Sequence, residues 1–324
     1  MAAFASGVFA VSMSATILPF AHPSYDAVMS LHSKVPKSAM TADLLGTERS
    51  AHAVQVTASG LLLTVGYAVM EADEVWLTNR KGHTAQAIVL AQDYDSGLAL
   101  LKPMTPIGLH HLGTALGSSV KAGDTLGVLG AGDRETHPVA LHSVNEFAGR
   151  WEYLLDAAFY TLPLYERWSG AALLTPDGSL CGIGSLALGL RSTQGAVEPG
   201  NLFVPVDLVM PHLEYMQLHG QKPGRIRPWL GTLVEEHDSE LYLVGMYHGG
   251  PAARAGLQPG DIILSVDRQP VSTMAAFFRS VWSYGPAGVS VPLLVSDGKD
   301  IREVMLDTVD RASFFMQHAA STIN

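Results

Sequence analysis

The stretch Arg167-Trp168-Ser169-Gly170-Ala171-Ala172-Leu173 places a serine on a turn of small residues, just before the apolar pair Leu173-Leu174 and the Asp177-Gly178 turn. Short apolar runs between such turns recur on both sides of it, and the chain contains 32 glycines and 18 prolines. This punctuation favours an all-β architecture over a helix bundle. A serine on such a turn is also a candidate nucleophile, provided that a neighbouring group removes its proton.

The composition supports a globular protein with a large core. The chain has 324 residues, of which 48% are hydrophobic and 15% charged, enough for two or three domains. Its formal net charge is −10 and no cluster of Lys and Arg occurs, which argues against a nucleic-acid partner. The single cysteine, Cys181, excludes an internal disulfide and lies in an apolar run, where a small buried side chain is expected.

The N-terminal segment allows two interpretations. Residues 2–21 carry no charge and are long enough to cross a bilayer, although the basic start of a secretory signal is missing. The first interpretation is an export signal or membrane anchor, and the second is an arm that packs on the body or on a neighbouring subunit. Residues 22–50 show no sustained periodicity and are predicted to continue as a linker or arm.

From residue 51 the pattern predicts two sets of short strands, which indicates a barrel or sandwich in each half. A helix is predicted over 206–218, with Pro211 expected to kink or split it. Residues 221–227 are polar and basic and are predicted to be a linker. A third block follows, with strands at 229–234, 241–247, 261–266, 289–295 and 301–306, a helical turn at 251–255 and a helix at 273–282. The pattern predicts two strand-rich halves followed by a small α+β module.

Several motifs resemble one known family. The run Gly250-Pro251-Ala252-Ala253-Arg254-Ala255-Gly256-Leu257-Gln258-Pro259-Gly260-Asp261-Ile262-Ile263 is similar to the PDZ signature, and Arg227-Pro228-Trp229-Leu230-Gly231 resembles the carboxylate-binding loop of such domains. The earlier markers are Leu62-Leu63-Thr64, Asp95-Ser96-Gly97-Leu98-Ala99-Leu100-Leu101-Lys102, Gly123-Asp124 and Ser169-Gly170. The chain thus resembles the HtrA/DegP group, trypsin-like serine proteases with a C-terminal PDZ domain. The resemblance implies a mainly β fold, with a trypsin-like double β-barrel over 51–220, a PDZ domain over 221–310 and a tail over 311–324, after an N-terminal arm over 1–50.

The departures from the family pattern concern its catalytic triad. Ser169 retains the nucleophile position, but the general-base histidine is replaced by Tyr67 and the aspartate by Gly97. A tyrosine hydroxyl titrates near pKa ~10 and is a poor base at neutral pH. Arg167 replaces a glycine whose backbone is left-handed in the family, so backbone strain is expected there. These substitutions predict a degenerate, inactive triad.

Alternatives remain for these residues. Ser169 is either a structural turn serine or a nucleophile that uses a displaced base. Arg167 and Trp168 either plug the vacated cleft or form a new recognition surface. Histidines of the barrel region that are candidates for a displaced base, although none lies at a family position, are His52, His83, His110, His111, His137 and His142. His110 and His111 are adjacent, so they make a poor metal pair; no metal or other cofactor is predicted.

The PDZ module retains its binding motif. The resemblance implies that the backbone amides of the loop Trp229, Leu230, Gly231 and Thr232 receive a peptide carboxylate, with side-chain pockets beside the helix of Met274 and Phe278. Arg225 and Arg227 are candidates to add positive charge nearby.

Three hypotheses follow for function. The first is a non-catalytic scaffold or adaptor that binds protein C-termini, extended peptides or a partner subunit. The second is an active serine endopeptidase with a displaced base. The third is a structural subunit of a membrane-associated complex whose PDZ groove is filled internally. The resemblance also implies a periplasmic or envelope location and a homotrimer.

Overall fold

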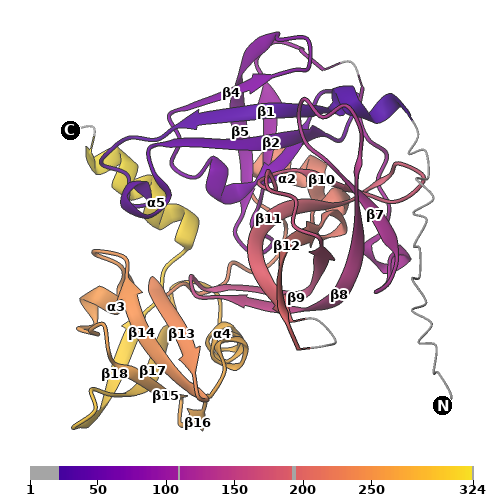
Figure 1. Cartoon of the computed structure of the whole chain (residues 1–324). Coiled ribbons are helices and arrows are strands. Elements are labelled where there is room, and N and C mark those ends of the chain that lie inside the picture. Colours follow the sequence, from indigo (N-terminus) through magenta and orange to yellow (C-terminus); the bar gives the residue numbers. More distant parts are fainter. Residues whose placement is uncertain (1–21, 109, 192–194, 323–324) are drawn as a thin grey trace, which may run out of the picture.

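Two closed β-barrels are followed by a separate sheet in the computed structural model, which describes residues 22–108, 110–191 and 195–322 (Figure 1). The first barrel has the strand order β1-β2-β3-β6-β5-β4, and the second has the order β10-β11-β12-β9-β8-β7. The strands of the first barrel are β1 (Val28–Lys34), β2 (Glu48–Gln55), β3 (Leu62–Val65), β4 (Glu74–Thr78), β5 (Thr84–Asp93) and β6 (Leu98–Pro103). Those of the second are β7 (Thr125–Leu129), β8 (His137–Gly149), β9 (Tyr153–Leu162), β10 (Ala172–Leu174), β11 (Leu180–Arg191) and β12 (Val197–Pro205). The short elements around them are η1 (His22–Ala27), α1 (Ala42–Leu45), η2 (Gly66–Ala68) and η3 (Gly117–Ser119).

The third unit is a six-stranded sheet with two helices, as expected for a PDZ domain. Its elements are β13 (Thr232–His237), β14 (Glu240–Met246), α3 (Pro251–Arg254), β15 (Ile262–Val266), β16 (Gln269–Pro270), α4 (Met274–Ser283), β17 (Ser290–Ser296) and β18 (Ile301–Asp307). The Thr273 side chain accepts a hydrogen bond from the backbone N–H of Ala276 and caps α4. The apolar core of this unit includes Leu154 of β9, so the second barrel packs directly against it. The predicted fold class is therefore confirmed.

The prediction of an arm over residues 22–50 is wrong for much of that segment. Strand β1 pairs with both β2 and β4 and closes the first barrel, and β2 begins at Glu48. The sequence does not reveal these strands, because the polar residues Ser33 and Arg49 stand at buried positions where an apolar residue is expected. The Ser33 hydroxyl donates to the carbonyl oxygen of Ala68 at 2.5 Å, which is how a polar residue is accommodated in this core.

Pro211 divides the helix predicted over 206–218. The segment forms the turns η4 (Val206–Leu208) and η5 (Met210–His212), followed by the short helix α2 (Leu213–His219). Gly220 ends α2 in a left-handed conformation, with φ of 76°.

The C-terminal segment predicted as a tail is a helix, α5 (Arg311–Thr322), which lies back beside the first barrel (Figure 1). Phe315 of α5 stacks on Tyr94, with 6.3 Å between the ring centroids, and lies 5.7 Å from the ring of Trp229. Trp229 was predicted to begin a strand, but that strand begins at Thr232, and Trp229 forms an isolated bridge with Val309.

Among the described residues, no helix is long and apolar enough to cross a membrane. The predicted anchor or signal over 2–21 lies outside the described residues.

Candidate functional site

The structure brings Tyr67 and Ser169 together. Tyr67 lies in the turn η2 at the end of β3, and Ser169 lies on the turn before β10. The Tyr67 hydroxyl donates its proton to the carbonyl oxygen of Ser185 at 2.8 Å and lies 3.1 Å from the Ser169 Oγ, within hydrogen-bond distance. Burial raises the pKa of Tyr67, although the hydrogen bond to Ser169 opposes this shift. At neutral pH Tyr67 therefore keeps its proton and cannot act as a general base for Ser169.

Gly97, the position predicted for the triad aspartate, lies against another aromatic ring. Gly97 has a φ of 72°, and a Cβ added there would lie 3.0 Å from the Tyr153 ring. Tyr153 is buried, and its hydroxyl donates to the carbonyl oxygen of Ser96 at 2.6 Å. An aspartate at position 97 would meet this ring from a strained backbone. A carboxylate side chain at position 97 would therefore require the Tyr153 ring to move.

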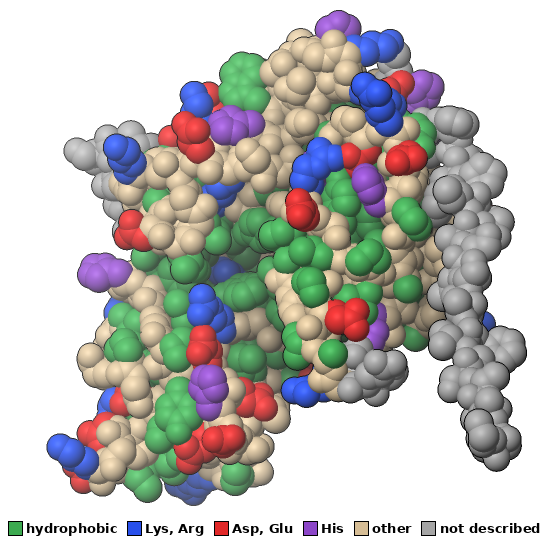
Figure 2. Space-filling model, viewed as in Figure 1, with side chains coloured by type: hydrophobic (Ala, Val, Ile, Leu, Met, Phe, Trp, Pro, Cys, Tyr) green, Lys and Arg blue, Asp and Glu red, His purple; other side chains and the backbone are tan. Residues whose placement is uncertain are grey.

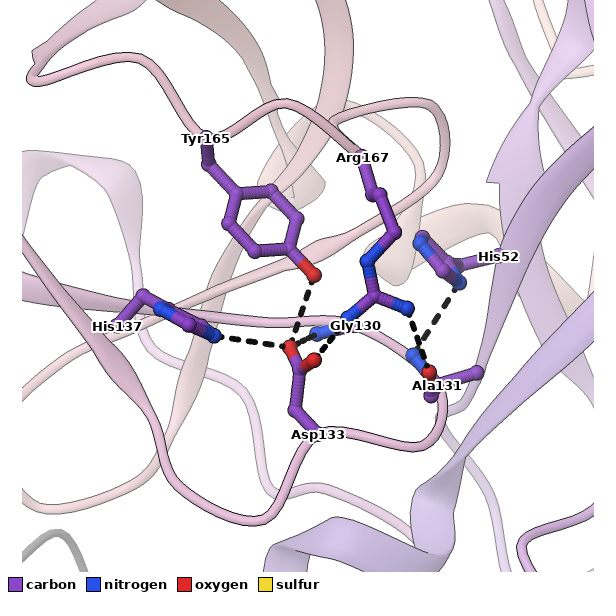
Figure 3. A network of polar contacts seen from close by, with 7 residues as sticks. All are labelled: His52, Gly130, Ala131, Asp133, His137, Tyr165 and Arg167. Atoms are coloured by element: carbon purple, nitrogen blue, oxygen red, sulfur yellow. Dashed lines mark hydrogen bonds and ion pairs between the residues drawn. The ribbon is translucent and has the colours of Figure 1, made fainter.

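Arg167, two residues before Ser169, turns toward a buried carboxylate. Its guanidinium pairs with Asp133 and donates to the carbonyl oxygen of Ala131 at 3.1 Å (Figure 3). Asp133 also accepts from the Tyr165 hydroxyl and from the Gly130 N–H, each at 2.8 Å, and lies 3.5 Å from His137 Nε2. The predicted left-handed strain at Arg167 is wrong, because its φ is not positive. The side chain is accommodated by the ion pair with Asp133.

His52 is the histidine that adjoins the serine turn. Its backbone N–H donates to the carbonyl oxygen of Ser169 at 2.8 Å. Figure 3 shows that its Nδ1 accepts from the Ala131 N–H, at 3.2 Å. Burial lowers the pKa of His52 to about 4, and the nearby charge of Arg167 adds to this effect. His52 is therefore neutral at pH 7. The hydroxyl within hydrogen-bond distance of the Ser169 Oγ is that of Tyr67.

The low pKa of His52 predicts a loss of stability in acid. The folded pKa of about 4 lies below the ordinary 6.5, so stability is fully present above pH 6.5 and is lost progressively as the pH falls toward 4. Between pH 7 and 5 this loss is expected to be about 2 kcal/mol in the free energy of unfolding. Urea unfolding of the wild type and of His52→Gln at both pH values measures it. His52→Gln should lose less free energy of unfolding than the wild type between pH 7 and pH 5. Equal losses in the two proteins would contradict the low pKa of His52.

Two cavities flank the serine turn. One of about 510 Å³ is lined by His52, Ser169 and Trp168, among others. The other, of about 440 Å³, is lined by Tyr67 and Trp168 from the barrels and by Leu233 and Tyr247 from the PDZ unit. Figure 2 shows a recess lined largely by hydrophobic side chains between these two parts. Trp168 contributes to both cavities, so it lines the cleft without filling it.

The predicted carboxylate loop holds a carboxylate from the chain itself. Glu152, between β8 and β9, is buried, and its Oε2 accepts from the Leu230 N–H at 2.9 Å. Its Oε1 accepts from the Thr232 N–H at 2.7 Å and from the Thr232 hydroxyl at 3.0 Å. Sequence reasoning missed Glu152, because nothing near it in sequence distinguishes it from a solvent-exposed turn acid.

The other predicted groove residues have varied surroundings. Phe278 is buried in the core of the PDZ unit, whereas Met274 is partly buried against that core. Trp229 is buried beneath aromatic rings of Tyr247 and α5, and Gly231 has a φ of 74°. Arg225 and Arg227, predicted to add positive charge near the carboxylate loop, have other partners. Arg225 donates to the Trp282 carbonyl oxygen, and Arg227 pairs with Asp95 at 3.3 Å and lies over the Trp282 ring.

Within the described ranges, no group of three or more His, Cys, Asp and Glu side chains is placed to hold a metal ion.

Comparisons with known proteins agree with this organisation. A family model for the PDZ domain matches residues 244–295. A probable periplasmic serine endoprotease DegP-like from Halomonas elongata is 25% identical over 277 residues, covering 79% of this chain and 55% of the relative. The serine endoprotease DegS of Escherichia coli is 26% identical over 277 residues, covering 75% of this chain and 72% of DegS. The chain spans about half the length of the DegP-like relatives that it matches.

Solved structures support the fold. The HtrA-type protease AlgW, solved with a decapeptide, aligns with a TM-score of 0.54 at 22% identity, over 89% of this chain and 96% of AlgW. A serine endoprotease from Yersinia pestis aligns with a TM-score of 0.51 at 20% identity, over 89% of this chain and 95% of that one. The chain is therefore similar to HtrA-type serine proteases with a C-terminal PDZ domain.

Proposed function

We propose that this chain is a non-catalytic relative of the HtrA-type proteases, which acts by binding proteins through its PDZ domain. The observation that carries the proposal is the Tyr67 hydroxyl, 3.1 Å from the Ser169 Oγ, where a base would have to stand. A serine hydroxyl is a weak nucleophile unless a base accepts its proton in the transition state. The Tyr67 hydroxyl keeps its proton, which it donates to the carbonyl oxygen of Ser185, and burial raises its pKa further from neutrality.

The surroundings of the pair support the same conclusion. No carboxylate can be introduced at Gly97 without displacing the ring of Tyr153, so a base at position 67 would lack its orienting partner. His52 is a candidate alternative base, since its backbone is hydrogen-bonded to the serine turn and it lines the same cavity as Ser169. Its pKa of about 4 makes it a weak base, and its Nδ1 already accepts a backbone hydrogen bond.

The opposing hypothesis is an active endopeptidase, since the relatives are named serine endoproteases and Ser169 retains the nucleophile position. A fluorescent phosphonate probe distinguishes the two, because it forms a covalent bond only with an activated serine. We expect no labelling of the purified wild-type chain above that of Ser169→Ala, in a preparation that melts cooperatively. An active trypsin-like protease in a parallel reaction confirms that the probe is reactive. Labelling of the wild type that is lost in Ser169→Ala would overturn the non-catalytic function.

The partners that we propose are protein C-termini or extended peptides. The support is the loop of Leu230 and Thr232, whose amides already bind a carboxylate, together with the PDZ family match. We also propose a periplasmic or envelope location, in keeping with the DegP-like relatives that are named periplasmic. Homotrimer formation and membrane association through residues 2–21 stay predictions.

A further inference from the structure

We propose that the hairpin tip Arg150–Glu152 is a built-in ligand of the PDZ domain, which occupies the carboxylate loop and must leave before an external C-terminus binds. The inference rests on the proposed function and concerns the regulation of that same site. Its basis is the Glu152 carboxylate, which accepts both backbone amides of the loop, from Leu230 and Thr232.

The hairpin tip also pairs with the edge of the PDZ sheet as a peptide does. The Val234 N–H of β13 donates to the carbonyl oxygen of Arg150 at 2.9 Å. Glu152 therefore contacts Thr232, and Arg150, two residues earlier, contacts Val234, two residues later on β13. That is the register of an antiparallel strand added to a sheet edge, which is how PDZ domains bind extended peptides. The side-chain carboxylate of Glu152 stands where the terminal carboxylate of such a peptide would stand.

The conformation of Glu152 fits a residue held by this loop. Its φ is 57°, in the left-handed region that side-chain-bearing residues seldom adopt, and it is buried. Burial raises the pKa of Glu152, whereas its hydrogen bonds to Leu230 and Thr232 and the positive charge of Arg311 oppose this. Arg311 also donates to the carbonyl oxygen of Trp151 at 3.4 Å. A buried acid in a rare backbone conformation is retained where its surroundings hold it, here the carboxylate loop and Arg311.

The tip makes a further contact with the PDZ unit that a peptide can readily replace. Arg150 pairs with Glu235 at 2.9 Å, but both side chains are more than a third exposed, so this ion pair is weak. Below the tip, Leu154 is buried in the PDZ core, and Arg279 of α4 pairs with Glu146 and Asp156 on either side of the hairpin. The base of the hairpin thus stays docked, and the tip is the part that a peptide displaces.

Displacement sets the apparent affinity of the groove. A site that is open in only a fraction of the molecules binds a ligand more weakly by that fraction. If the tip occupies the loop in 90–99% of molecules, removing its carboxylate raises the affinity for external C-termini by roughly 10- to 100-fold.

The test uses the full chain and the variant Glu152→Gly, which deletes the carboxylate and suits a positive φ. The probes are fluorescein-labelled decapeptides with a free C-terminal Val, Leu or Phe, and their C-terminal amides serve as negative ligands. The matched control is Asp238→Gly, an exposed acid with a φ of 51° in the β13–β14 turn, which removes the same charge away from the loop. Fluorescence anisotropy should show binding of a free-acid peptide by Glu152→Gly at least about 10-fold tighter than by the wild type or Asp238→Gly, and no such gain for the amides.

A second readout needs no peptide. Hydrogen exchange of the amides of Leu230 and Thr232 should be faster in Glu152→Gly than in the wild type, and unchanged in Asp238→Gly. Unchanged exchange in Glu152→Gly would overturn the built-in ligand. Peptide binding of equal affinity by the wild type and Glu152→Gly would also overturn it, but would leave the proposed peptide binding intact. Faster exchange in Glu152→Gly, with no binding of the free-acid peptides to the wild type or to either variant, would contradict peptide binding itself. It would make the tip a fixed structural joint and so overturn its displacement.

Discussion

Gly170→Ala is expected to destabilise the fold by about 4 kcal/mol, a large share of the roughly 5–15 kcal/mol by which proteins are usually stable. Gly170 follows the candidate nucleophile and has a φ of 73°. A Cβ added there would lie 2.9 Å from the carbonyl carbon of His52 and closer still to its oxygen, which belong to the backbone of β2. Backbone atoms of a barrel strand cannot move aside as a flexible side chain can, so the clash adds to the cost of the left-handed conformation. Urea unfolding measured by circular dichroism gives the change.

Gly132→Ala is the matched control for this substitution. Gly132 has a φ of 82°, but a Cβ added there meets nothing within 4 Å. Gly132→Ala should lower the free energy of unfolding only by the cost of placing a Cβ on a left-handed backbone, about 1–2 kcal/mol. Similar losses for the two variants would show that the approach of His52 to position 170 is not tight in solution. That result would also weaken the placement of the serine turn against β2.

Arg49→Met is the second large effect, with an expected loss of about 4 kcal/mol in the free energy of unfolding. Arg49 is only 6% exposed and lies in β2. Its Nη1 donates to the carbonyl oxygens of Tyr67 at 2.7 Å and Met70 at 3.0 Å, and its Nη2 donates to the Thr41 hydroxyl at 2.8 Å. Methionine fills similar space but donates nothing, so these acceptors would be left unpaired in a buried site.

The substitution also tests the candidate site, because Arg49 donates to the backbone of Tyr67, the residue at the position predicted for the base. We expect the loss for Arg49→Met in thermal and urea unfolding, together with weaker near-ultraviolet circular dichroism from Tyr67 and its neighbours. Arg134→Met, at an exposed arginine between β7 and β8, should change the stability by less than about 0.5 kcal/mol. A loss at position 49 no greater than this would contradict the buried hydrogen-bond network.

Local signals in the sequence were sufficient for the fold class and for the PDZ unit. Turn residues between short apolar runs predicted the strands, and the resemblance of the run 250–263 to the PDZ signature implied the PDZ unit. The same logic failed where a strand carries buried polar side chains. β1 and the start of β2 look like a linker because Ser33 and Arg49 interrupt the apolar pattern, yet both side chains are hydrogen-bonded inside the fold.

The triad positions show a second limit. Motif positions predicted that Tyr67, Gly97 and Ser169 would meet without a base or a carboxylate. That the Tyr67 hydroxyl contacts Ser169 across 102 residues of sequence, and that Tyr153 covers Gly97, are properties of packing. The pKa of His52 likewise follows from burial beside Arg167, which no neighbouring residue in the sequence reveals.

By itself the sequence determined the two strand-rich halves and the small α+β module, because these depend on residue type and spacing along the chain. Its resemblance to a known family implied the PDZ unit and predicted that Ser169 lacks its usual base. Only the tertiary structure decided what occupies the carboxylate loop. Glu152 reaches Leu230 across 78 residues of sequence, through the docking of the β8–β9 hairpin against the PDZ unit. The sequence shows a glutamate at position 152, but not whether its carboxylate faces solvent or a buried pair of amides. Those surroundings form only when distant segments pack together.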